Sequence, residues 1–214
     1  MKPLLILRPE PGNSATAARA RALGLMPVQR PLFAVGALPW SAPDPVEFDG
    51  LLLTSANAVR HGGRELGKLR TLDVFAVGEA TAEVARAAGF RVAMTGAGGV
   101  DALLATLPGQ RRLLHLTGAD HRRADTCHLI VSQAVYLAAP LAPTILAGEQ
   151  VALVHSPRAG ARLADLAPDR PAIAIAAISA AAARACGGGW ASVDWPPRPN
   201  DADLLALGAR LCQG

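Results

Sequence analysis

Short apolar runs alternate with helical segments along most of the chain, and residues 73–90 show this unit most clearly. Residues 74–77 (Val-Phe-Ala-Val) are strand formers, and Gly78 interrupts them. Residues 80–88 then carry charged and small apolar side chains at helical spacing, and Gly89 stands where a helix usually ends. The pattern predicts a strand, a tight turn and a helix.

The same strand-and-helix unit recurs through the sequence. We expect further apolar strands at residues 4–8, 51–54, 91–94, 112–117, 151–155, 172–178 and 192–195. Apolar strands that alternate with helices are typical of parallel sheets covered on both faces, in which ligands bind beyond the carboxyl ends of the strands. Those ends carry Arg8, Ser55, Gly78, Thr117, Ser156 and Ser179. They do not form an obvious pair of nucleophile and base.

Two other extended stretches interrupt this rhythm. Residues 28–35 contain Pro31, and residues 130–137 are followed by Pro140 and Pro143, which suits strands at the edge of a sheet. We therefore expect one α/β domain built from residues 1–33 and 139–214, a second domain inserted at residues 34–138, and a double linker formed by the two stretches. A ligand site is expected in the cleft between two such domains.

The rhythm also fails after the expected strand at residues 112–117. Residues 118–128 are polar, and no amphipathic helix of normal length fits there. The sequence predicts a loop that carries Asp120, His121, Arg122 and Arg123 in place of a helix.

Composition limits the classes of function. The chain has 214 residues, of which 51% are hydrophobic, and a formal net charge of +4, which is compatible with an anionic ligand. The arginines are scattered and no lysine-rich run exists, so nucleic acid is not expected as a partner. No run approaches the roughly 20 apolar residues of a membrane span, and the first apolar run is too short for a signal peptide, so a soluble cytoplasmic protein is expected. The spacing of the cysteines and histidines predicts neither disulfides nor a metal site.

Each candidate side chain has an ordinary structural alternative. Arg8 could bind a carboxylate, or it could be a solvated charge beside Pro9. Serine, threonine and asparagine after a strand could simply cap the next helix, although their repeated placement at strand ends favours ligand contact for the set. Tyr136, the only tyrosine, could face the expected cleft or pack as an aromatic residue of an edge strand.

Four stretches carry a resemblance to a known family. They are residues 48–59 (Phe-Asp-Gly-Leu-Leu-Leu-Thr-Ser-Ala-Asn-Ala-Val), 76–82 (Ala-Val-Gly-Glu-Ala-Thr-Ala), 155–158 (His-Ser-Pro-Arg) and 177–179 (Ala-Ile-Ser). In their order and spacing they resemble the uroporphyrinogen-III synthase family over essentially the whole chain. The resemblance implies an α/β fold of two flavodoxin-like parallel-sheet domains joined by a two-stranded linker. It also implies that hydroxymethylbilane is closed to uroporphyrinogen III, with inversion of ring D and loss of water.

The resemblance further implies a site that uses no metal and no organic cofactor. In the family a tyrosine on the second linker strand is the acid near the leaving hydroxyl, and Tyr136 falls at that place. The candidates for binding the substrate carboxylates are Arg8, Ser55, Asn57, Gly78, Thr81, Thr117, Ser156, Arg158 and Ser179. The expected partner is this linear tetrapyrrole, with a transient handover from the enzyme that makes hydroxymethylbilane. Nucleic acid and membrane are not expected, and the protein is expected to be a monomer.

Two rival classes stay open on the sequence alone. One is a non-catalytic, hinge-closing binding module for a small anionic ligand, which no diagnostic catalytic group excludes. The other is an α/β enzyme of the phosphosugar type. Formation of isomer III from hydroxymethylbilane separates a synthase from both, because spontaneous closure gives isomer I.

Overall fold

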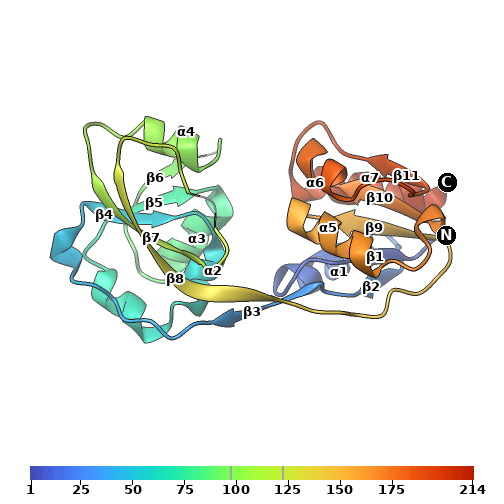
Figure 1. Cartoon of the computed structure of the whole chain (residues 1–214), viewed down its shortest axis with the longest axis horizontal. Coiled ribbons are helices and arrows are strands. Elements are labelled where there is room, and N and C mark those ends of the chain that lie inside the picture. The colour runs from blue at the N-terminus through green and yellow to red at the C-terminus, as the bar shows by residue number, and fades with distance from the viewer. Residues whose placement is uncertain (97, 122) are drawn as a thin grey trace. The chain divides into compact units, whose positions relative to one another are not determined.

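The computed structural model describes residues 1–96, 98–121 and 123–214 of the chain. The chain divides into two compact units, which are coloured along the sequence in Figure 1. Unit 1 contains Met1–Ala34 and Pro140–Gly214, and unit 2 contains Val35–Ala139. Each unit has its own sheet and its own buried apolar core, so each can be understood separately.

Unit 1 is built on a five-stranded parallel sheet with the order β11-β10-β9-β1-β2. Its strands are β1 (Leu4–Ile6), β2 (Pro27–Gln29), β9 (Gln150–Val154), β10 (Ile173–Ala177) and β11 (Ser192–Asp194). Leu4 of β1 lies opposite Val151 of β9. The first strand of the chain is therefore completed by strands from its last third.

Helices cover both faces of the sheet of unit 1. They are α1 (Gly12–Ala22), α5 (Pro157–Leu166), α6 (Ala180–Ala185), α7 (Asp201–Gln213) and the 3-10 turn η3 (Arg170–Ala172). Helices α1 and α7 pack against Leu4 and Ile6 in one core cluster. Helices α5 and α6 pack against each other on β9 and β10, whose residues are all buried. Burial on both faces explains why these strands are continuous apolar runs.

Unit 2 contains a six-stranded sheet with the order β3-β8-β7-β4-β5-β6. The pairs from β8 to β6 are all parallel. The strands are β3 (Phe33–Ala37), β4 (Gly50–Leu53), β5 (Val74–Val77), β6 (Val92–Gly96), β7 (Arg112–Gly118) and β8 (Leu129–Pro140). The polar ends of β4, β5 and β7 thus meet at one edge of the sheet.

The helical elements of unit 2 also lie on two faces. They are α2 (Ala56–His61), α3 (Glu79–Ala87), α4 (Val100–Ala105) and the 3-10 turns η1 (Pro45–Glu47) and η2 (Gly63–Leu69). Leu51 and Leu53 pack with α2 and α3 in one cluster, whereas Leu52 packs with α4 in another. Successive residues of a strand point to opposite faces, which accounts for this division.

The unit predicted for residues 73–90 is confirmed as β5 followed by α3. Gly78 joins them with φ of 83°, and Gly89 follows the helix with φ of 83°. Both angles lie in the left-handed region, which glycine adopts without the steric cost of a Cβ. The turn and the helix stop therefore depend on glycine at these two positions.

The connection from β7 to β8 contains no helix in its described residues, 119–121 and 123–128. The predicted loop is thus confirmed, while its Arg122 lies outside the described residues. Because β7 and β8 are nevertheless parallel neighbours, this loop alone crosses over them where a helix would otherwise pack.

The sequence predicts the first helix at residues 12–23, with Asn13 or Ser14 as its N-cap; the start at Gly12 is confirmed, but the predicted cap is wrong. Neither Asn13 nor Ser14 caps it, because α1 begins at Gly12 after Pro11. Asn13 is buried, and its side-chain amide donates to the carbonyl oxygens of Ile6 and Arg8, at 2.8 Å each. The side chain that looked like a cap thus holds the end of β1.

The extended stretch at residues 28–35 is two strands. It contains β2, at one edge of the sheet of unit 1, and the start of β3, at one edge of the sheet of unit 2. Pro31 lies between them. Edge positions suit a proline, because its missing N–H removes no ladder hydrogen bond there.

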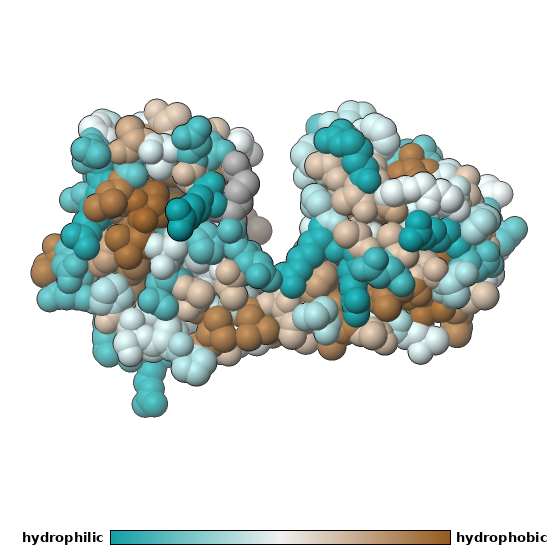
Figure 2. All heavy atoms as spheres, in the orientation of Figure 1, coloured by the Kyte–Doolittle hydropathy of each residue, from teal (hydrophilic) through white to brown (hydrophobic). Residues whose placement is uncertain are grey.

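The surface that faces the viewer in Figure 2 mixes hydrophilic and hydrophobic side chains over both units. The large apolar side chains that are exposed are Met1, Leu23, Met26, Val46, Leu129, Leu141, Leu146 and Trp195. Among the described residues no helix has the length and apolar character needed to cross a bilayer.

Candidate active site

The carboxyl ends of β4, β5 and β7 in unit 2 border a hollow of about 300 Å³. It is lined by Thr54, Ser55, Val77, Val100, His115, Thr117, Asp120, His121, Ala124 and Tyr136. Three of the residues proposed from the sequence, Ser55, Thr117 and Tyr136, therefore lie together. This edge of a parallel sheet is where ligands bind, so the hollow is the candidate active site of unit 2.

Tyr136 enters the hollow from β8. The pairing of β7 with β8 shifts register after Thr117, so that Gly118 lies opposite Tyr136. The backbone N–H of Ala119 donates to the carbonyl oxygen of Tyr136 at 2.9 Å. The phenol ring is 6.2 Å from the ring of His61, centroid to centroid. The shift places the ring over the end of β7 and beside the hollow.

His115 is a member of this site that the sequence argument missed. It lies on β7, only 5% of its surface is exposed, and its Nε2 is 3.0 Å from the hydroxyl oxygen of Thr54. Burial lowers the pKa of His115 from 6.5 to about 4, and the nearby His121 ring, 5.7 Å away, acts in the same direction. A polar residue inside the run Leu-Leu-His-Leu was the signal that could have revealed it.

The Thr54–His115 pair has the spacing of a nucleophile and its base, but not the required basicity. A general base works best when its pKa lies near the operating pH. With a pKa of about 4, His115 is neutral at pH 7 and is a weak base. The pair is therefore suited to donate and accept hydrogen bonds, not to activate the threonine for attack.

A second hollow, of about 580 Å³, shares His115, His121 and Ala124 with the first. Its lining is completed by Arg123, Thr126, His128, Ile130 and Ser132. His128 is engaged on both ring nitrogens, since Nδ1 accepts from the N–H of Arg111 and Nε2 donates to the carbonyl oxygen of Leu104. The loop between β7 and β8 thus borders both hollows.

The serine candidates cap helices, which is the ordinary alternative noted for them. Ser55, Ser156 and Ser179 each accept a backbone N–H from the first turn of α2, α5 and α6, at 3.2, 3.2 and 3.3 Å. A hydroxyl that accepts in this way still has its own hydrogen to donate. Capping therefore fixes these side chains at the strand ends without removing their donor.

The other candidates of unit 2 do not belong to the lining of the first hollow as far as the described residues show it. Asn57 accepts from the guanidinium of Arg60 at 3.4 Å. Thr81 is buried in the first turn of α3, and Gly78 precedes that helix. Their neighbourhood is the amino end of a helix, where unpaired N–H groups favour anions.

In unit 1 the candidate Arg8 already binds a carboxylate of its own chain. Its Nη1 lies 2.8 Å from Oδ1 of Asp201, in the first turn of α7. Arg19 pairs with the other oxygen of the same carboxylate. Two guanidinium groups therefore share one carboxylate, and the cluster keeps a positive charge at the carboxyl end of β1.

His155 is the third partner of Asp201, with Nε2 2.9 Å from Oδ1. A carboxylate only accepts, so Nε2 of His155 donates the hydrogen of this contact. The hydrogen bond from His155 is the largest cause that lowers the pKa of Asp201, and the charges of Arg8, His155 and Arg19 act in the same direction against burial. Asp201 is thus held ionised and ties β1, β9, α1 and α7 together.

Arg158, the last candidate, lies in the first turn of α5. Its guanidinium carbon is 4.4 Å from the centroid of the Phe33 ring, a cation–π arrangement. The structure thus places the candidates of unit 1 at three positions: the Arg8 cluster, the start of α5, and the start of α6, where Ser179 follows β10.

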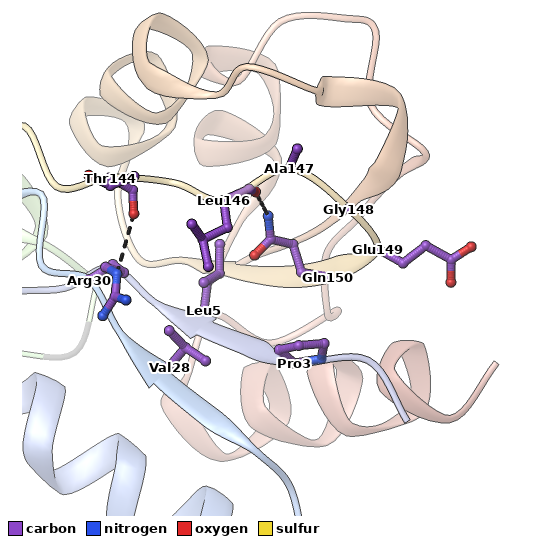
Figure 3. A pocket seen from close by; sticks show the side chains of 10 residues that line it. All are labelled: Pro3, Leu5, Val28, Arg30, Thr144, Leu146, Ala147, Gly148, Glu149 and Gln150. Atoms are coloured by element: carbon purple, nitrogen blue, oxygen red, sulfur yellow. Dashed lines mark hydrogen bonds between the residues drawn. The ribbon is translucent and has the colours of Figure 1, made fainter.

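A third hollow, of about 220 Å³, lies in unit 1 over β1 and β2 (Figure 3). Leu5, Val28 and Leu146 supply its apolar lining. Its polar groups are used within the chain: Arg30 donates to the carbonyl oxygen of Thr144 at 3.3 Å, and the Gln150 amide donates to that of Leu146 at 2.6 Å. The lining contains none of the site residues proposed from the sequence.

Metal ligands are not gathered in the described part of the chain, where no group of three or more histidine, cysteine, aspartate or glutamate side chains could hold an ion. The first hollow offers hydroxyl groups, a phenol and the neutral imidazole of His115, and its lining also contains the carboxylate of Asp120 and the ring of His121. The hydroxyl groups and the imidazole can hold carboxylates and a leaving hydroxyl by hydrogen bonds, and the phenol can donate a proton.

The chain is similar to solved structures over its whole length. The uroporphyrinogen-III synthetase of Helicobacter pylori 26695 is 15% identical, with a TM-score of 0.71 over 98% of this chain and 99% of that chain. A mutant uroporphyrinogen III synthase of the extremely thermophilic bacterium Thermus thermophilus is 19% identical, with a TM-score of 0.58 over 100% and 99%. At such identities the likeness shows the fold alone. A comparison with curated protein sequences finds no match.

Two mainly parallel sheets with polar residues at their strand ends define an α/β protein of the two-unit kind found in these structures. The family model described as Uroporphyrinogen-III synthase HemD matches residues 14–206. The chain belongs to the uroporphyrinogen-III synthase family, whose members are cyclizing lyases of porphyrin and haem biosynthesis with a tetrapyrrole substrate.

Proposed function

We propose that this chain closes hydroxymethylbilane to uroporphyrinogen III, with inversion of ring D and loss of water. The observation that carries the proposal is the family match over residues 14–206. The hollow of unit 2 adds chemical support, because it offers hydrogen-bond donors and a phenol rather than a nucleophile with an active base. A substrate that carries its own reactivity needs only such groups.

In this proposal Tyr136 is the acid. The C–O bond of the hydroxymethyl group breaks, the oxygen takes a proton from the phenol and leaves as water, and the pyrrole N–H of the same ring gives up its proton, which restores the phenol and leaves a neutral azafulvene. The substituted carbon of ring D then attacks the methylene carbon of this azafulvene, and a spiro intermediate forms. Holding the two reacting carbons together supplies much of the acceleration, since positioning alone can remove about 7–11 kcal/mol of a barrier. The place of Tyr136 at the rim of the hollow supports this role.

Substrate carboxylates are bound, in this proposal, by the hydroxyls and helix starts at strand ends. In unit 2 these belong to Ser55, Asn57, Gly78, Thr81 and Thr117. In unit 1 we assign Arg8, Ser156, Arg158 and Ser179 to the same task. Support comes from the positive charge that the Arg8 cluster keeps and from the free hydroxyl hydrogens of the capping serines.

We propose that the two units are domains of the flavodoxin type, with boundaries at residues 1–33 plus 139–214 and at 34–138. If the five strands of unit 1 are renumbered 1 to 5 in the order in which they occur along the chain, their order across the sheet is 2-1-3-4-5. This is the strand order of flavodoxin. The five parallel strands of unit 2 have the order 3-2-1-4-5, with β3 added at the edge. Unit 2 is therefore the less typical of the two.

The chain passes between the units twice, and we propose that these two passages form a two-stranded linker. The N–H of Leu38 donates to the carbonyl oxygen of Val135 within unit 2, at 2.9 Å. The N–H of Leu141 donates to that of Leu32 within unit 1, at 2.8 Å. The two segments are thus bonded to each other on either side of the passage.

We further propose a monomeric, cytoplasmic protein that receives its substrate by transient handover from the enzyme that makes hydroxymethylbilane. Each unit buries a core of its own residues, so neither core needs a second chain to complete it. The spontaneous closure of free hydroxymethylbilane to isomer I gives handover an advantage, because it shortens the time the substrate spends in water.

The test is to mix purified protein with hydroxymethylbilane and to separate isomers I and III. The protein should raise isomer III well above the amount formed in its absence. Heat-denatured protein provides the baseline. A product mixture that is all isomer I at every protein concentration would refute the proposal and would leave a binding module as the alternative.

A further inference from the structure

We propose that Gly118 is a positioning residue for Tyr136. The absence of a side chain at Gly118 leaves the space on β7 in which the phenol ring lies. The inference rests on the proposed function for its catalytic consequence, but not for its structural content. It assigns a role to a residue that was neither a site candidate nor part of the lining of the first hollow.

The geometry is specific to the phenol end of the ring. A Cβ on Gly118 would lie 2.9 Å from Cε2 and 2.9 Å from Cζ of Tyr136, and 3.2 Å from its hydroxyl oxygen. Carbon atoms in van der Waals contact are about 3.5–4.0 Å apart. The ring is therefore seated against the backbone of Gly118, with the hydroxyl carbon among the atoms closest to it.

The backbone of Gly118 does not itself require glycine. Its φ is not among the positive values of the chain, so alanine can adopt the same conformation. The three atoms nearest to the added Cβ all belong to the Tyr136 side chain. The room for the ring is thus the structural reason for glycine at this position.

The register shift explains why the Tyr136 ring lies against Gly118. Before Thr117 the pairing of β7 with β8 is regular, and after it Gly118 faces Tyr136 instead of Val135. Val135 is fully buried, whereas Tyr136 is half-buried and lines the hollow. The shift and the glycine together turn the ring toward the hollow and fix its height above β7.

Alanine at position 118 should displace the ring by about 0.6–1.1 Å, which is the difference between the 2.9 Å separation of the added Cβ from the ring and a normal carbon–carbon contact of about 3.5–4.0 Å. A misplacement of about 1 Å can cost up to 10²-fold in rate. We expect Gly118→Ala to lower kcat for isomer III formation about 10-fold, with a smaller change in KM. In a Tyr136→Phe background the same substitution should change kcat less than about 2-fold, because no hydroxyl is left to misplace.

Placement can be measured without any activity. Tyr136 is the only tyrosine of the chain, so 3-fluorotyrosine labelling of the full-length protein places fluorine on this residue alone, and the ¹⁹F resonance reports on its ring. Gly118→Ala should move that resonance. The matched control is Gly36→Ala, on β3 in the same unit, where an added Cβ meets nothing within 4 Å. It should leave the resonance where it is.

The proposal is overturned if Gly118→Ala leaves the resonance unchanged, or if it lowers kcat equally with and without the tyrosine hydroxyl. If Gly118→Ala folds poorly, the proposal is tested by comparing the Tm of Tyr136→Ala with that of Gly118→Ala/Tyr136→Ala. If the Tyr136 ring is the only group that clashes with the new Cβ, the two variants have the same Tm. A lower Tm for the double variant overturns the proposal. If Gly118→Ala moves the resonance but the protein makes no isomer III, the inferred contact between Gly118 and the Tyr136 ring stands and only the proposed function is refuted.

Discussion

The buried His115 should make the stability of unit 2 depend on pH. The pKa of His115 is lowered from 6.5 to about 4 in the folded protein, first by burial and then by the charge of His121. Below pH 6.5 His115 therefore binds a proton in the unfolded chain but stays unprotonated in the folded unit until the pH approaches 4. The contribution of His115 to stability is fully present above pH 6.5 and is lost as the pH falls toward 4.

The size of the effect follows from the same two values. Their difference, 6.5 − 4 = 2.5, corresponds to at most about 3 kcal/mol, since one pH unit is worth about 1.4 kcal/mol. Between pH 7 and pH 5 the linkage amounts to about 2 kcal/mol of unfolding free energy. His115→Gln keeps a donor and an acceptor for Thr54 but cannot titrate, so it should remove this part of the pH dependence.

The assay uses Trp40, the only tryptophan of unit 2. Its indole N–H donates to the carbonyl oxygen of Gly62 at 2.8 Å, so its fluorescence reports on the folded unit. In a Trp190→Phe/Trp195→Phe background, urea unfolding is followed at pH 7 and pH 5, with and without His115→Gln. Between pH 7 and pH 5 the free energy of unfolding of the parent should fall by about 2 kcal/mol more than that of His115→Gln.

His155→Gln is the control, because His155 belongs to unit 1 and should not alter the pH dependence seen by Trp40. Equal losses in the parent and in His115→Gln would mean that His115 is not the neutral buried group described above. The same result would remove the reason for treating the Thr54–His115 pair as a fixed donor and acceptor.

Two further predictions concern the acid and the carboxylate cluster. Tyr136→Phe should slow the initial rate of isomer III formation by about 10²-fold or less without abolishing it, because a phenol is a weak acid at neutral pH; a folded but fully inactive variant would contradict this. The pKa of Asp201 is lowered in the folded state. The ionised carboxylate therefore stabilises the protein at pH values above the pKa that Asp201 has in the unfolded chain, and this contribution is lost as the pH falls through the folded pKa. Asp201→Asn should therefore lower Tm at pH 7 and differ less from the parent as the pH falls through that folded pKa, whereas an unchanged Tm at pH 7 would show that Asp201 ties nothing together.

Local signals in the sequence were enough for the elements and for the strand ends. The apolar runs, Gly78 and Gly89 predicted β5 and α3, and the polar residues after strands predicted the edge at which the first hollow lies. Such features depend on a few neighbouring residues. They can be read without knowing what packs against them.

Contacts between distant residues could not be predicted in that way. Asn13 looked like a helix cap, yet it bonds to the end of β1 across the turn. Arg8 looked free to bind a ligand, yet its carboxylate partner, Asp201, stands 193 positions later in the chain. His115 gave only a weak signal, because a polar residue in an apolar run acquires its meaning from Thr54 on another strand.

The pairing of β1 with β9 sets the order in which the chain can fold during its synthesis. Leu4 of β1 can pair with Val151 of β9 only after Val151 has been synthesised. The sheet of unit 1 therefore stays incomplete until the ribosome has made the last third of the chain. All strands of the sheet of unit 2 lie between Leu4 and Val151 in the sequence and can fold first. Once they have, the hydrogen bond from Leu38 to Val135 holds the two ends of the insertion together. The loop that β1 and β9 must close is then far shorter than the sequence between them, and each halving of a loop lowers its closure cost by about 0.6 kcal/mol.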